Sequence, residues 1–321
     1  MTGPRLVTCG EAMIRLSTPT GHLLRNTPVL NVHVGGSELN AAIVAAQLGV
    51  DACWISSLPE GPLGERIVDH ARTFGVEVVA ASSNDRVGLY FVEIGPAPRD
   101  SEVYYDRQRS SFSTSTADQL VELALEHPTD AVLASGITLA LGGGPARFAT
   151  RLLERTGTLV RFFEVNHRSK LWGAAEARPA IEKVLPNVDI LIASAHDLSG
   201  LLDLGDDIVV AARRAQERWG IQTVVVSGRS GGVGEVGVNE ITVIAGDVVA
   251  AASAQGLVID PVGAGDASTG AYIATWLRTG SHQASAEQAA RAAALKQTCV
   301  GDALVLDVGS LDGAVRPRIR R

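Results

Sequence analysis

The segment Asp260–Asp266, with the sequence DPVGAGD, carries the clearest chemical signal in the chain, and a helical pattern follows it directly. Glycines at the start of a helix let backbone N–H groups approach an anion closely, and the helix dipole adds positive potential there. An acid in that place can take a proton from a hydroxyl while the amides hold phosphoryl charge. The candidate base is Asp266, and the candidate anion-holding residues are Gly263, Ala264 and Gly265. An ordinary first-turn acid explains Asp266 equally well at this point.

A second segment, Val34–Asn40 with the sequence VGGSELN, opens an alanine-rich helical pattern near the N-terminus. Gly36 permits close approach of the backbone to a ligand, and the amide of Asn40 can donate and accept hydrogen bonds to hydroxyl groups. A tight turn before a capped helix explains the same residues. Taken alone, the segment leaves both interpretations open.

Apolar strand-like runs alternate with helical patterns along most of the chain. Buried continuous strands that alternate with helices indicate an α/β fold in which a mostly parallel sheet has helices on both faces. The strand-like runs are Arg5–Cys9, Ala52–Ser57, Asp130–Ser135, Leu159–Val165, Val188–Ala193 and Thr223–Ser227. The helical patterns are Glu38–Leu48, Leu63–Phe74, Pro145–Arg155, Ala174–Val184, Asp207–Trp219, Asp266–Arg278 and Ala284–Thr298.

Three segments break this rhythm and predict a small β-sheet apart from the main one. Val29–Val34 and Val87–Glu93 alternate or nearly alternate, and Glu102–Asp106 is short and aromatic. We expect antiparallel strands that form a lid over a site. The lid would come from two insertions, at roughly residues 12–34 and 86–112, into one domain that spans residues 1–321.

Two further features lie near the C-terminus. Gly232–Val238 and Glu240–Ala250 predict a β-hairpin that turns at Asn239–Glu240. The tail Val315–Arg321 is basic, and we expect it to be frayed.

Composition narrows the class of protein. The chain has 321 residues, 46% of them hydrophobic, and a net charge of −7. That charge excludes broad electrostatic binding to nucleic acid or to an anionic membrane, but not a local basic pocket for a small anion. Cys9, Cys53 and Cys299 are far apart, which excludes a zinc ribbon and a disulfide scaffold. No transmembrane run or signal segment is recognisable, so we expect a cytoplasmic protein.

The two glycine-rich segments together resemble the paired signatures of the ribokinase-like, PfkB-type sugar kinases. Their separation, the lid-like strands and the α/β rhythm match that family over essentially the whole chain. The resemblance implies a ribokinase-like three-layer α/β/α fold with a small β-sheet lid. It also implies ATP-dependent phosphorylation of a sugar-type hydroxyl, with Asp266 as the base and Mg²⁺ assisting. No P-loop motif GxxxxGK[ST] is present, which excludes a P-loop kinase.

Within that family the chain most resembles the 2-keto-3-deoxygluconate kinases. The segments that carry this resemblance are Gly10–Ser17, Val87–Tyr90, Tyr104–Arg107, Val165–Trp172, Ala294–Thr298 and Gly301-Asp302. The residues implied to bind the sugar acid are Gly36, Asn40, Tyr90, Tyr105, Arg107, Arg168 and Asp266.

A carboxylate substrate needs cationic partners, and an arginine fork can bind a carboxylate through two hydrogen bonds. We therefore expect Arg107, from the lid, and Arg168, from the main sheet, to converge on the acid group. Each residue also has an ordinary explanation. Arg107 could be a solvated charge on an edge strand, Arg168 a surface ion-pair partner, and Tyr90 and Tyr105 simple lid packing.

The candidate nucleotide-binding segment is Val224–Val233, whose pattern indicates a strand, a glycine-rich turn and a second strand. This stretch resembles the family's adenine-nucleotide turn, although a plain hairpin loop would look the same. The residues implied to bind ATP are Asn166, Ser227, Gly228, Gly231, Gly263 and Gly265.

The metal side shows one departure from the family pattern. Where family members usually carry Asn-x-x-Glu, this chain has Ser194 and Asp197. Mg²⁺ normally keeps several waters, so the shorter Asp197 carboxylate can still hold its water shell. K⁺ is a further cation that the resemblance allows.

The leading interpretation is an ATP-dependent kinase that converts 2-keto-3-deoxygluconate, or a close sugar acid, to its 6-phosphate. A kinase for a neutral sugar or a nucleoside is the second, and the two arginines count against it. A non-catalytic sugar-binding relic is the third, supported only by Ser194 and Asp197. No nucleic acid or membrane partner is expected. Exposed lid edges favour a homodimer or a higher homo-oligomer.

Overall fold

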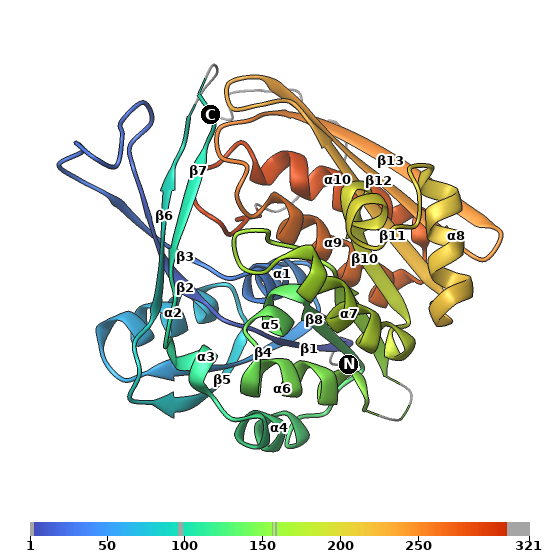
Figure 1. Cartoon of the computed structure of the whole chain (residues 1–321), viewed down its shortest axis with the longest axis horizontal. Coiled ribbons are helices and arrows are strands. Elements are labelled where there is room, and N and C mark those ends of the chain that lie inside the picture. Colours follow the sequence, from blue (N-terminus) through green and yellow to red (C-terminus); the bar gives the residue numbers. More distant parts are fainter. Residues whose placement is uncertain (1–2, 96–98, 156, 158, 307–321) are drawn as a thin grey trace.

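The computed structural model describes residues 3–95, 99–155, 157 and 159–306 (Figure 1). Its main sheet has nine strands, and all neighbours from β11 to β5 run parallel. β12 and β13 are antiparallel additions at one edge. Their order across the sheet is β13 (Val248–Leu257), β12 (Val236–Ala245), β11 (Thr223–Ser230), β10 (Ile190–Ser194), β9 (Val160–Glu164), β8 (Ala131–Ser135), β1 (Arg5–Cys9), β4 (Asp51–Pro59) and β5 (Glu77–Ser83).

Helices cover both faces of this sheet, as the alternating pattern predicts. The helical elements are α1 (Ser37–Gln47), α2 (Pro62–Thr73), α3 (Ser111–Thr114), α4 (Ala117–Leu125), α5 (Gly136–Ala140), α6 (Gly143–Leu153), α7 (Ala174–Val184), η1 (Leu185–Asn187), η2 (Asp197–Leu201), α8 (Ile208–Trp219), α9 (Ala264–Thr279) and α10 (His282–Lys296). Apolar side chains of α4, α6, α7 and α8 pack on one face. Those of α1, α9 and α10 pack on the other.

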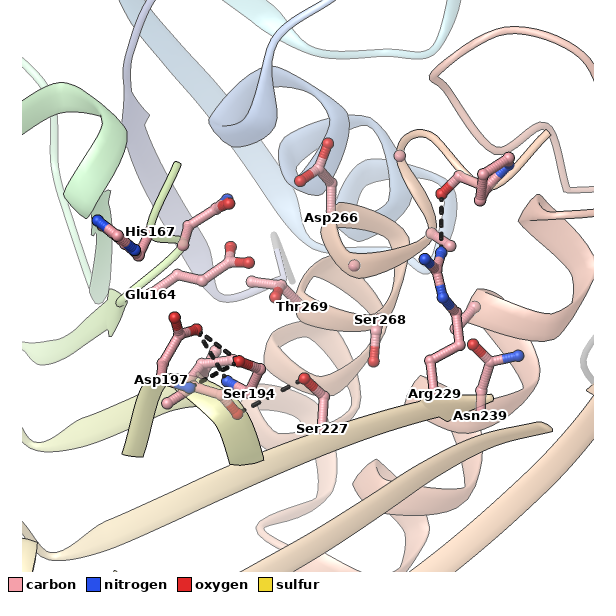
Figure 2. Close-up of a pocket in the computed structure, with 18 of the residues that line it drawn as sticks. Glu164, His167, Ser194, Asp197, Ser227, Arg229, Asn239, Asp266, Ser268 and Thr269 are labelled. Carbon is pink, nitrogen blue, oxygen red and sulfur yellow. Dashed lines mark hydrogen bonds between the residues drawn. The ribbon is translucent and has the colours of Figure 1, made fainter. Parts of the chain in front are cut away.

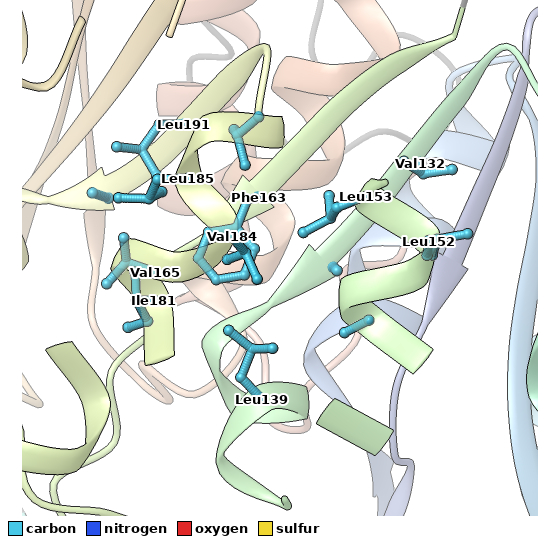
Figure 3. Packing of buried hydrophobic residues seen from close by; sticks show 14 of the residues in the cluster. Val132, Leu139, Leu152, Leu153, Phe163, Val165, Ile181, Val184, Leu185 and Leu191 are labelled. Atoms are coloured by element: carbon cyan, nitrogen blue, oxygen red, sulfur yellow. The ribbon is translucent and has the colours of Figure 1, made fainter. Parts of the chain in front are cut away.

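The core explains why the central strands are continuous apolar runs. Every residue of β8 is buried, because helices pack against both of its faces. Figure 3 shows one such layer, where Val132 of β8, Leu152 and Leu153 of α6, and Phe163 of β9 are brought together. Each large buried side chain of this kind contributes about 1.5–3 kcal/mol to folding.

The prediction of a ribokinase-like α/β/α fold is confirmed, and all six predicted strands of the main sheet are present. Several elements were not predicted, among them β5 and α4. β5 reads as a polar, alanine-containing segment because it is the half-exposed edge of the sheet. α4 was missed although Thr116 caps it, with its side chain accepting a hydrogen bond from the backbone N–H of Gln119.

The predicted hairpin turn at Asn239–Glu240 is wrong. Both residues lie inside β12, and the chain reverses between β12 and β13 at Gly246-Asp247. Asn239 favours turns in isolation, but here its buried side-chain amide donates a hydrogen bond to Gln297 Oε1 at 3.2 Å. The long-range partner therefore overrides the local preference.

The lid is a separate four-stranded sheet in the order β3 (Asn31–Gly35), β2 (Met13–Ser17), β6 (Gly88–Glu93) and β7 (Glu102–Asp106). Figure 1 shows it standing away from the main sheet. The expectation of antiparallel strands holds for β2–β3 and β6–β7, but β2 and β6 run parallel. The two pairs come from separate insertions, so no tight turn fixes the direction of one against the other.

The topology gathers chemistry at one edge of the main sheet. The carboxyl ends of β9, β10 and β11 lie side by side, and in open α/β sheets ligands bind outside such ends. The predicted tail Val315–Arg321 lies outside the described residues. Among the helices of the described chain, none has the length and apolar character needed to cross a membrane.

Candidate active site

A cavity of about 480 Å³ lies at this edge (Figure 2). One wall is formed by residues at and after the ends of β9, β10 and β11, among them Glu164, Ser194 and Ser227. A second wall is the turn Pro261–Gly265 with the first turns of α9. Tyr90 of β6 and Tyr105 of β7 close the cavity from the lid. The volume is within the range of small-molecule sites.

The glycine-rich turn is shaped by its first glycine. Gly263 is the N-cap of α9 and has a φ of 87°, in the left-handed region that favours glycine. A Cβ added there would also run into the backbone carbonyl of Asp302. The N–H groups of a first helical turn have no helical acceptor and point outward, so this turn presents donors and dipole potential to the cavity.

Asp266 is held on both carboxylate oxygens by residues of α1. Ser37 Oγ donates to Oδ1 at 2.9 Å, and Asn40 Nδ2 donates to Oδ2 at 2.7 Å. Asn166 Nδ2 in turn donates to Ser37 Oγ at 2.8 Å. Asn40 Oδ1 is buried and has no hydrogen-bond partner among the described residues. The arrangement fixes a carboxylate facing the cavity and leaves an acceptor beside it for a ligand hydroxyl.

Asn166 owes its position to an unusual backbone. It follows β9 with a φ of 39°, and asparagine is one of the few non-glycine residues that enters this region readily. The chain therefore turns at the strand end and aims the Asn166 amide at the Asp266 network.

Glu164, the last residue of β9, is a carboxyl group beside that network. Burial raises the pKa of Glu164 to about 8, the negative charges of Asp266 and Glu38 act in the same direction, and Arg168 opposes them. Figure 2 shows Glu164 facing Thr269 of α9. The carboxyl group of Glu164 therefore holds its proton more tightly than an ordinary glutamate does.

Positive charge reaches the cavity from two arginines. Arg168 and Arg229 both line it, and neither has an ion-pair partner among the described residues. Arg229 Nη1 lies 3.5 Å from the carbonyl oxygen of Pro261, at the turn. Burial and the charge of Arg168 lower the pKa of Arg229, which indicates that the two cations lie in one electrostatic environment. Two cations beside a helix N-terminus favour a multiply charged anion.

The residues that could hold Mg²⁺ are Asp197 and Glu164, which face the same cavity. Asp197 Oδ2 accepts hydrogen bonds from Ser194 Oγ at 2.7 Å and from the Ser194 N–H at 3.2 Å. Ser194 Oγ also accepts a hydrogen bond from the Asp197 N–H at 3.0 Å, so Ser194 orients the carboxylate. Mg²⁺ typically takes one or two carboxylates together with waters and substrate phosphates, and this donor set fits that mode.

A different cluster of possible metal ligands, Cys53, Glu77 and His127, lies at the amino ends of the strands. Arg5 already occupies it, with a hydrogen bond to Glu77 and a distance of 3.2 Å to His127 Nδ1. That cluster is therefore a partly exposed ion-pair site.

Arg107, on the lid, does not converge with Arg168 in the cavity as the sequence predicts. Arg107 is half-buried and pairs with the buried carboxylate of Glu11, to which Nε donates at 2.9 Å. Its guanidinium also lies 5.7 Å from the centre of the Tyr105 ring. Arg107 is thus neither a solvated edge charge nor a residue that lines the cavity.

Most of the predicted site residues meet at the cavity. Those that line it are Tyr90, Tyr105, Asn166, Arg168, Asp197, Ser227, Gly228, Gly263, Ala264, Gly265 and Asp266. Those outside the lining are Gly36, Asn40, Arg107 and Gly231. Asn40 still touches Asp266, and Gly36 brings the chain against the Glu11 carbonyl, where a Cβ would lie 2.6 Å away.

The polar residues at or beside the cavity that were not predicted include Ser37, Glu164, Arg229 and Glu11. Glu164 had a signal, since it is the one acid at the end of a buried strand-like run just before Asn166. Ser37 stood inside the glycine-rich segment, but its role depends on α9, which is 229 residues away along the chain.

Comparison with known proteins finds relatives over nearly the whole chain. The model of the pfkB family carbohydrate kinases matches residues 4–307. A 2-dehydro-3-deoxygalactonokinase of Haloferax volcanii is 35% identical over 97% of this chain and 96% of that protein. A 2-dehydro-3-deoxygluconokinase of Thermoproteus tenax is 32% identical over 92% of this chain and 89% of that one.

A solved structure shows the same similarity. The crystal structure of the 2-dehydro-3-deoxygluconokinase of Thermotoga maritima superposes with a TM-score of 0.90 at 30% identity, covering 97% of both chains. The chain therefore belongs to the pfkB family of carbohydrate kinases and is a sugar kinase.

Proposed function

We propose that this kinase transfers the γ-phosphoryl group of ATP to a hydroxyl of a 2-keto-3-deoxy sugar acid. 2-Keto-3-deoxygluconate, phosphorylated at its 6-hydroxyl, is the leading substrate. The observation that carries the proposal is the Asp266 carboxylate, held by Ser37 and Asn40 in a cavity that also contains Arg168. The family relatives named for 2-keto-3-deoxy acids support the choice of an acid over a neutral sugar.

In this proposal Asp266 accepts the proton of the attacking hydroxyl. Ser37 and Asn40 fix the carboxylate in one orientation, so the base needs no reorganisation before proton transfer. The N–H groups of the turn Gly263–Gly265 hold the charge that develops on the transferred phosphoryl group. Asn40 Oδ1, which lacks a protein partner among the described residues, accepts a hydrogen bond from a sugar hydroxyl.

ATP is proposed to enter along the ends of β10 and β11, where Ser227 and Gly228 line the cavity. Arg229, which lies at the glycine-rich turn, offsets the charge of its phosphates. Bound Mg²⁺ would neutralise phosphate charge, with Asp197 and Glu164 as the protein groups available to it.

The sugar carboxylate is proposed to bind Arg168, whose guanidinium has no ion-pair partner among the described residues. Arg107 is assigned to the same group from the lid side, where the sugar carboxylate would share it with Glu11. Since Glu11 Oε1 is buried without a hydrogen-bond partner among the described residues, this acid is a further candidate contact for a sugar hydroxyl.

A panel assay tests the function directly. ADP release would be followed with 2-keto-3-deoxygluconate, 2-keto-3-deoxygalactonate, fructose, ribose and a nucleoside. We expect the highest kcat/KM for one of the two keto-deoxy acids. A neutral sugar that exceeds both would favour the fructokinase or ribokinase type, and no turnover with any of them would favour the non-catalytic alternative.

We also propose a homodimer. Both edge strands of the lid, β3 and β7, lack a second neighbouring strand among the described residues, and Val32 and Tyr104 on them are exposed. Sedimentation equilibrium would show twice the chain mass, and a monomer at micromolar concentration would contradict the proposal.

A further inference from the structure

Arg15 of β2 is a fully buried cation that ties the lid sheet to the phosphoryl-binding turn. Its Nη2 lies 2.7 Å from Asp260 Oδ2, and its Nη1 donates to Asp302 Oδ1 at 2.9 Å. Neither Arg15 nor Asp260 exposes any side-chain surface. A guanidinium that bridges two carboxylates in the protein interior fixes the relative positions of the segments that carry them.

Both carboxylates belong to the structure of the turn. Asp260 begins the segment Asp260–Asp266, and its Oδ1 accepts a hydrogen bond from the Val262 N–H at 3.1 Å. Its Oδ2 accepts one from the Gly301 N–H at 2.9 Å, which fastens the neighbouring loop to the turn. The next residue of that loop, Asp302, has its backbone carbonyl packed directly on Gly263.

The same Asp302 reaches the sugar-facing wall of the lid. Tyr90 of β6 donates its phenol hydrogen to Asp302 Oδ2. The Tyr90 ring stacks on Tyr105 of β7, with 6.0 Å between ring centres and 26° between the planes. Both tyrosines line the cavity. An unbroken series of contacts therefore runs from the turn through Asp302 to the two aromatic side chains of the lid.

The charges of this buried cluster balance, so the loss of any one charged partner would destabilise it. Lys296, also fully buried, donates to the Asp260 carbonyl at 3.2 Å, so two cations face two carboxylates. Burial raises the pKa of Asp302, while the charge of Arg15 and the hydrogen bonds from Tyr90 and Arg15 oppose that rise. Removing one partner of such a cluster leaves a buried charge without compensation. The lid base at β2 is therefore rigidly joined to the turn.

We propose that Arg15 is a positioning residue for phosphoryl transfer. It fixes the position of the lid wall, which contacts the sugar, relative to the turn, which binds the phosphoryl group. Arg15 itself does not line the cavity and acts through Asp260, Asp302 and Tyr90. The inference rests on the proposed kinase function, because its consequence is the alignment of the sugar hydroxyl with the phosphoryl group.

The test uses the full-length enzyme and the variant Arg15→Met. In wild type we expect one ADP released per sugar phosphate formed. In Arg15→Met we expect kcat to fall by about 10–100-fold, as for misplacement of reacting groups by roughly 1 Å. We also expect a higher KM for the sugar and a ratio of ADP to sugar phosphate above one. That ratio does not depend on how much of the protein is folded, so a merely structural role would not move it.

The matched control is Arg86→Met. Arg86 also forms a lid ion pair, with Asp106, but both side chains are exposed. This variant should keep the wild-type kcat, KM and product ratio, because exposed ion pairs contribute little. A change in Arg86→Met equal to that in Arg15→Met would overturn the inference.

If Arg15→Met does not fold, Tyr90→Phe decides instead, since it removes one hydroxyl from the same cluster. We expect a higher sugar KM and a ratio of ADP to sugar phosphate above one in this variant. A sugar KM and a product ratio equal to those of wild type, in a folded Arg15→Met or Tyr90→Phe variant, would contradict the positioning role. Failure of the proposed function is a separate result, because wild-type enzyme would then show no turnover of any sugar acid.

Discussion

Ser37 Oγ lies 2.9 Å from Asp266 Oδ1 and is itself the acceptor of a hydrogen bond from Asn166. The candidate base on α9 is thus oriented by Ser37 of α1 and by Asn166, two residues after the end of β9. Three chain segments meet in one hydrogen-bonded series, which joins the two glycine-rich signatures into a single site.

Asp266→Asn should lower kcat by about 10²–10⁴-fold, because the amide cannot accept the proton of the sugar hydroxyl. The variant keeps the size of the side chain, so the melting temperature should change little. Single-turnover phosphorylation of 2-keto-3-deoxygluconate measures the chemical step directly. Near-wild-type turnover in the folded variant would remove Asp266 from the role of base.

Arg168→Met should lower kcat/KM for the sugar acid. Converted to a free energy, this loss of transition-state binding should be about 1.5–3 kcal/mol, the range for a hydrogen bond to a charged group. The effect on a neutral sugar should be smaller. Arg107→Met should show the same preference. Equal losses for both kinds of sugar would mean that the arginines serve the ATP phosphates or the structure.

The measurement on Arg107→Met requires a control in which its ion-pair partner, Glu11, is also changed. Because Arg107 neutralises the buried Glu11, the single variant leaves that carboxylate uncompensated. The double variant Arg107→Met, Glu11→Gln separates loss of the substrate contact from loss of folding stability. Because Glu11 is itself a candidate sugar contact, the reference is Glu11→Gln alone. A stable double variant with lower sugar-acid activity than Glu11→Gln would support a direct contact of Arg107.

The sequence predicts the α/β/α architecture because buried parallel strands carry uninterrupted apolar runs, such as β8. It also predicts the Asp266 turn, but only when that segment is taken together with the segment Val34–Asn40, since an ordinary capped helix explains either segment alone. It does not predict β5, a half-exposed edge strand without a clear alternation, or the reversal at Gly246-Asp247.

Pairings across the chain are the part of the site that local patterns cannot supply. Arg107 faces Glu11 instead of the cavity, and Asn239 is satisfied by Gln297, in each case through a contact distant in sequence. The same holds for Arg15, which reads as an ordinary strand residue and is in fact surrounded by Asp260 and Asp302.

Lys296 makes a prediction about monovalent cations. Its buried ammonium donates to the carbonyls of Asp260 and Cys299, each at 3.2 Å, next to the turn. A bound K⁺ would be held by just such inward-facing carbonyl oxygens, so the lysine already supplies a cation there. We expect the same kcat in potassium, sodium and tetramethylammonium buffers of equal ionic strength. Strong activation by K⁺ alone would contradict this.

Lys296→Met extends the test to stability. Removing one partner of a buried ionic cluster typically costs about 3–5 kcal/mol, so the variant should unfold at clearly lower denaturant concentration. Lys183→Met, at an exposed position of α7, is the matched control and should unfold like wild type.

The raised pKa of Glu164 predicts a pH-dependent stability with a definite sign. Because the folded-state pKa of about 8 lies above the ordinary value of 4.5, the folded protein binds this proton more tightly than the unfolded chain. Wild type should therefore lose stability relative to Glu164→Gln as pH rises from about 4.5 to 8, by at most about 1.4 kcal/mol per pH unit. Above pH 8 the difference should stay constant.

Denaturant unfolding of ligand-free wild type and Glu164→Gln, compared at pH 5, 6.5 and 8, measures this difference. At pH 5 the free energy of unfolding of Glu164→Gln should equal that of wild type or be lower. At each higher pH it should rise relative to that of wild type. Glu217→Gln, at an exposed position of α8, should show no such trend. A parallel pH dependence of wild type and Glu164→Gln would show that Glu164 is already ionised in the empty site. Asp266 would then face a second full negative charge before any nucleotide binds.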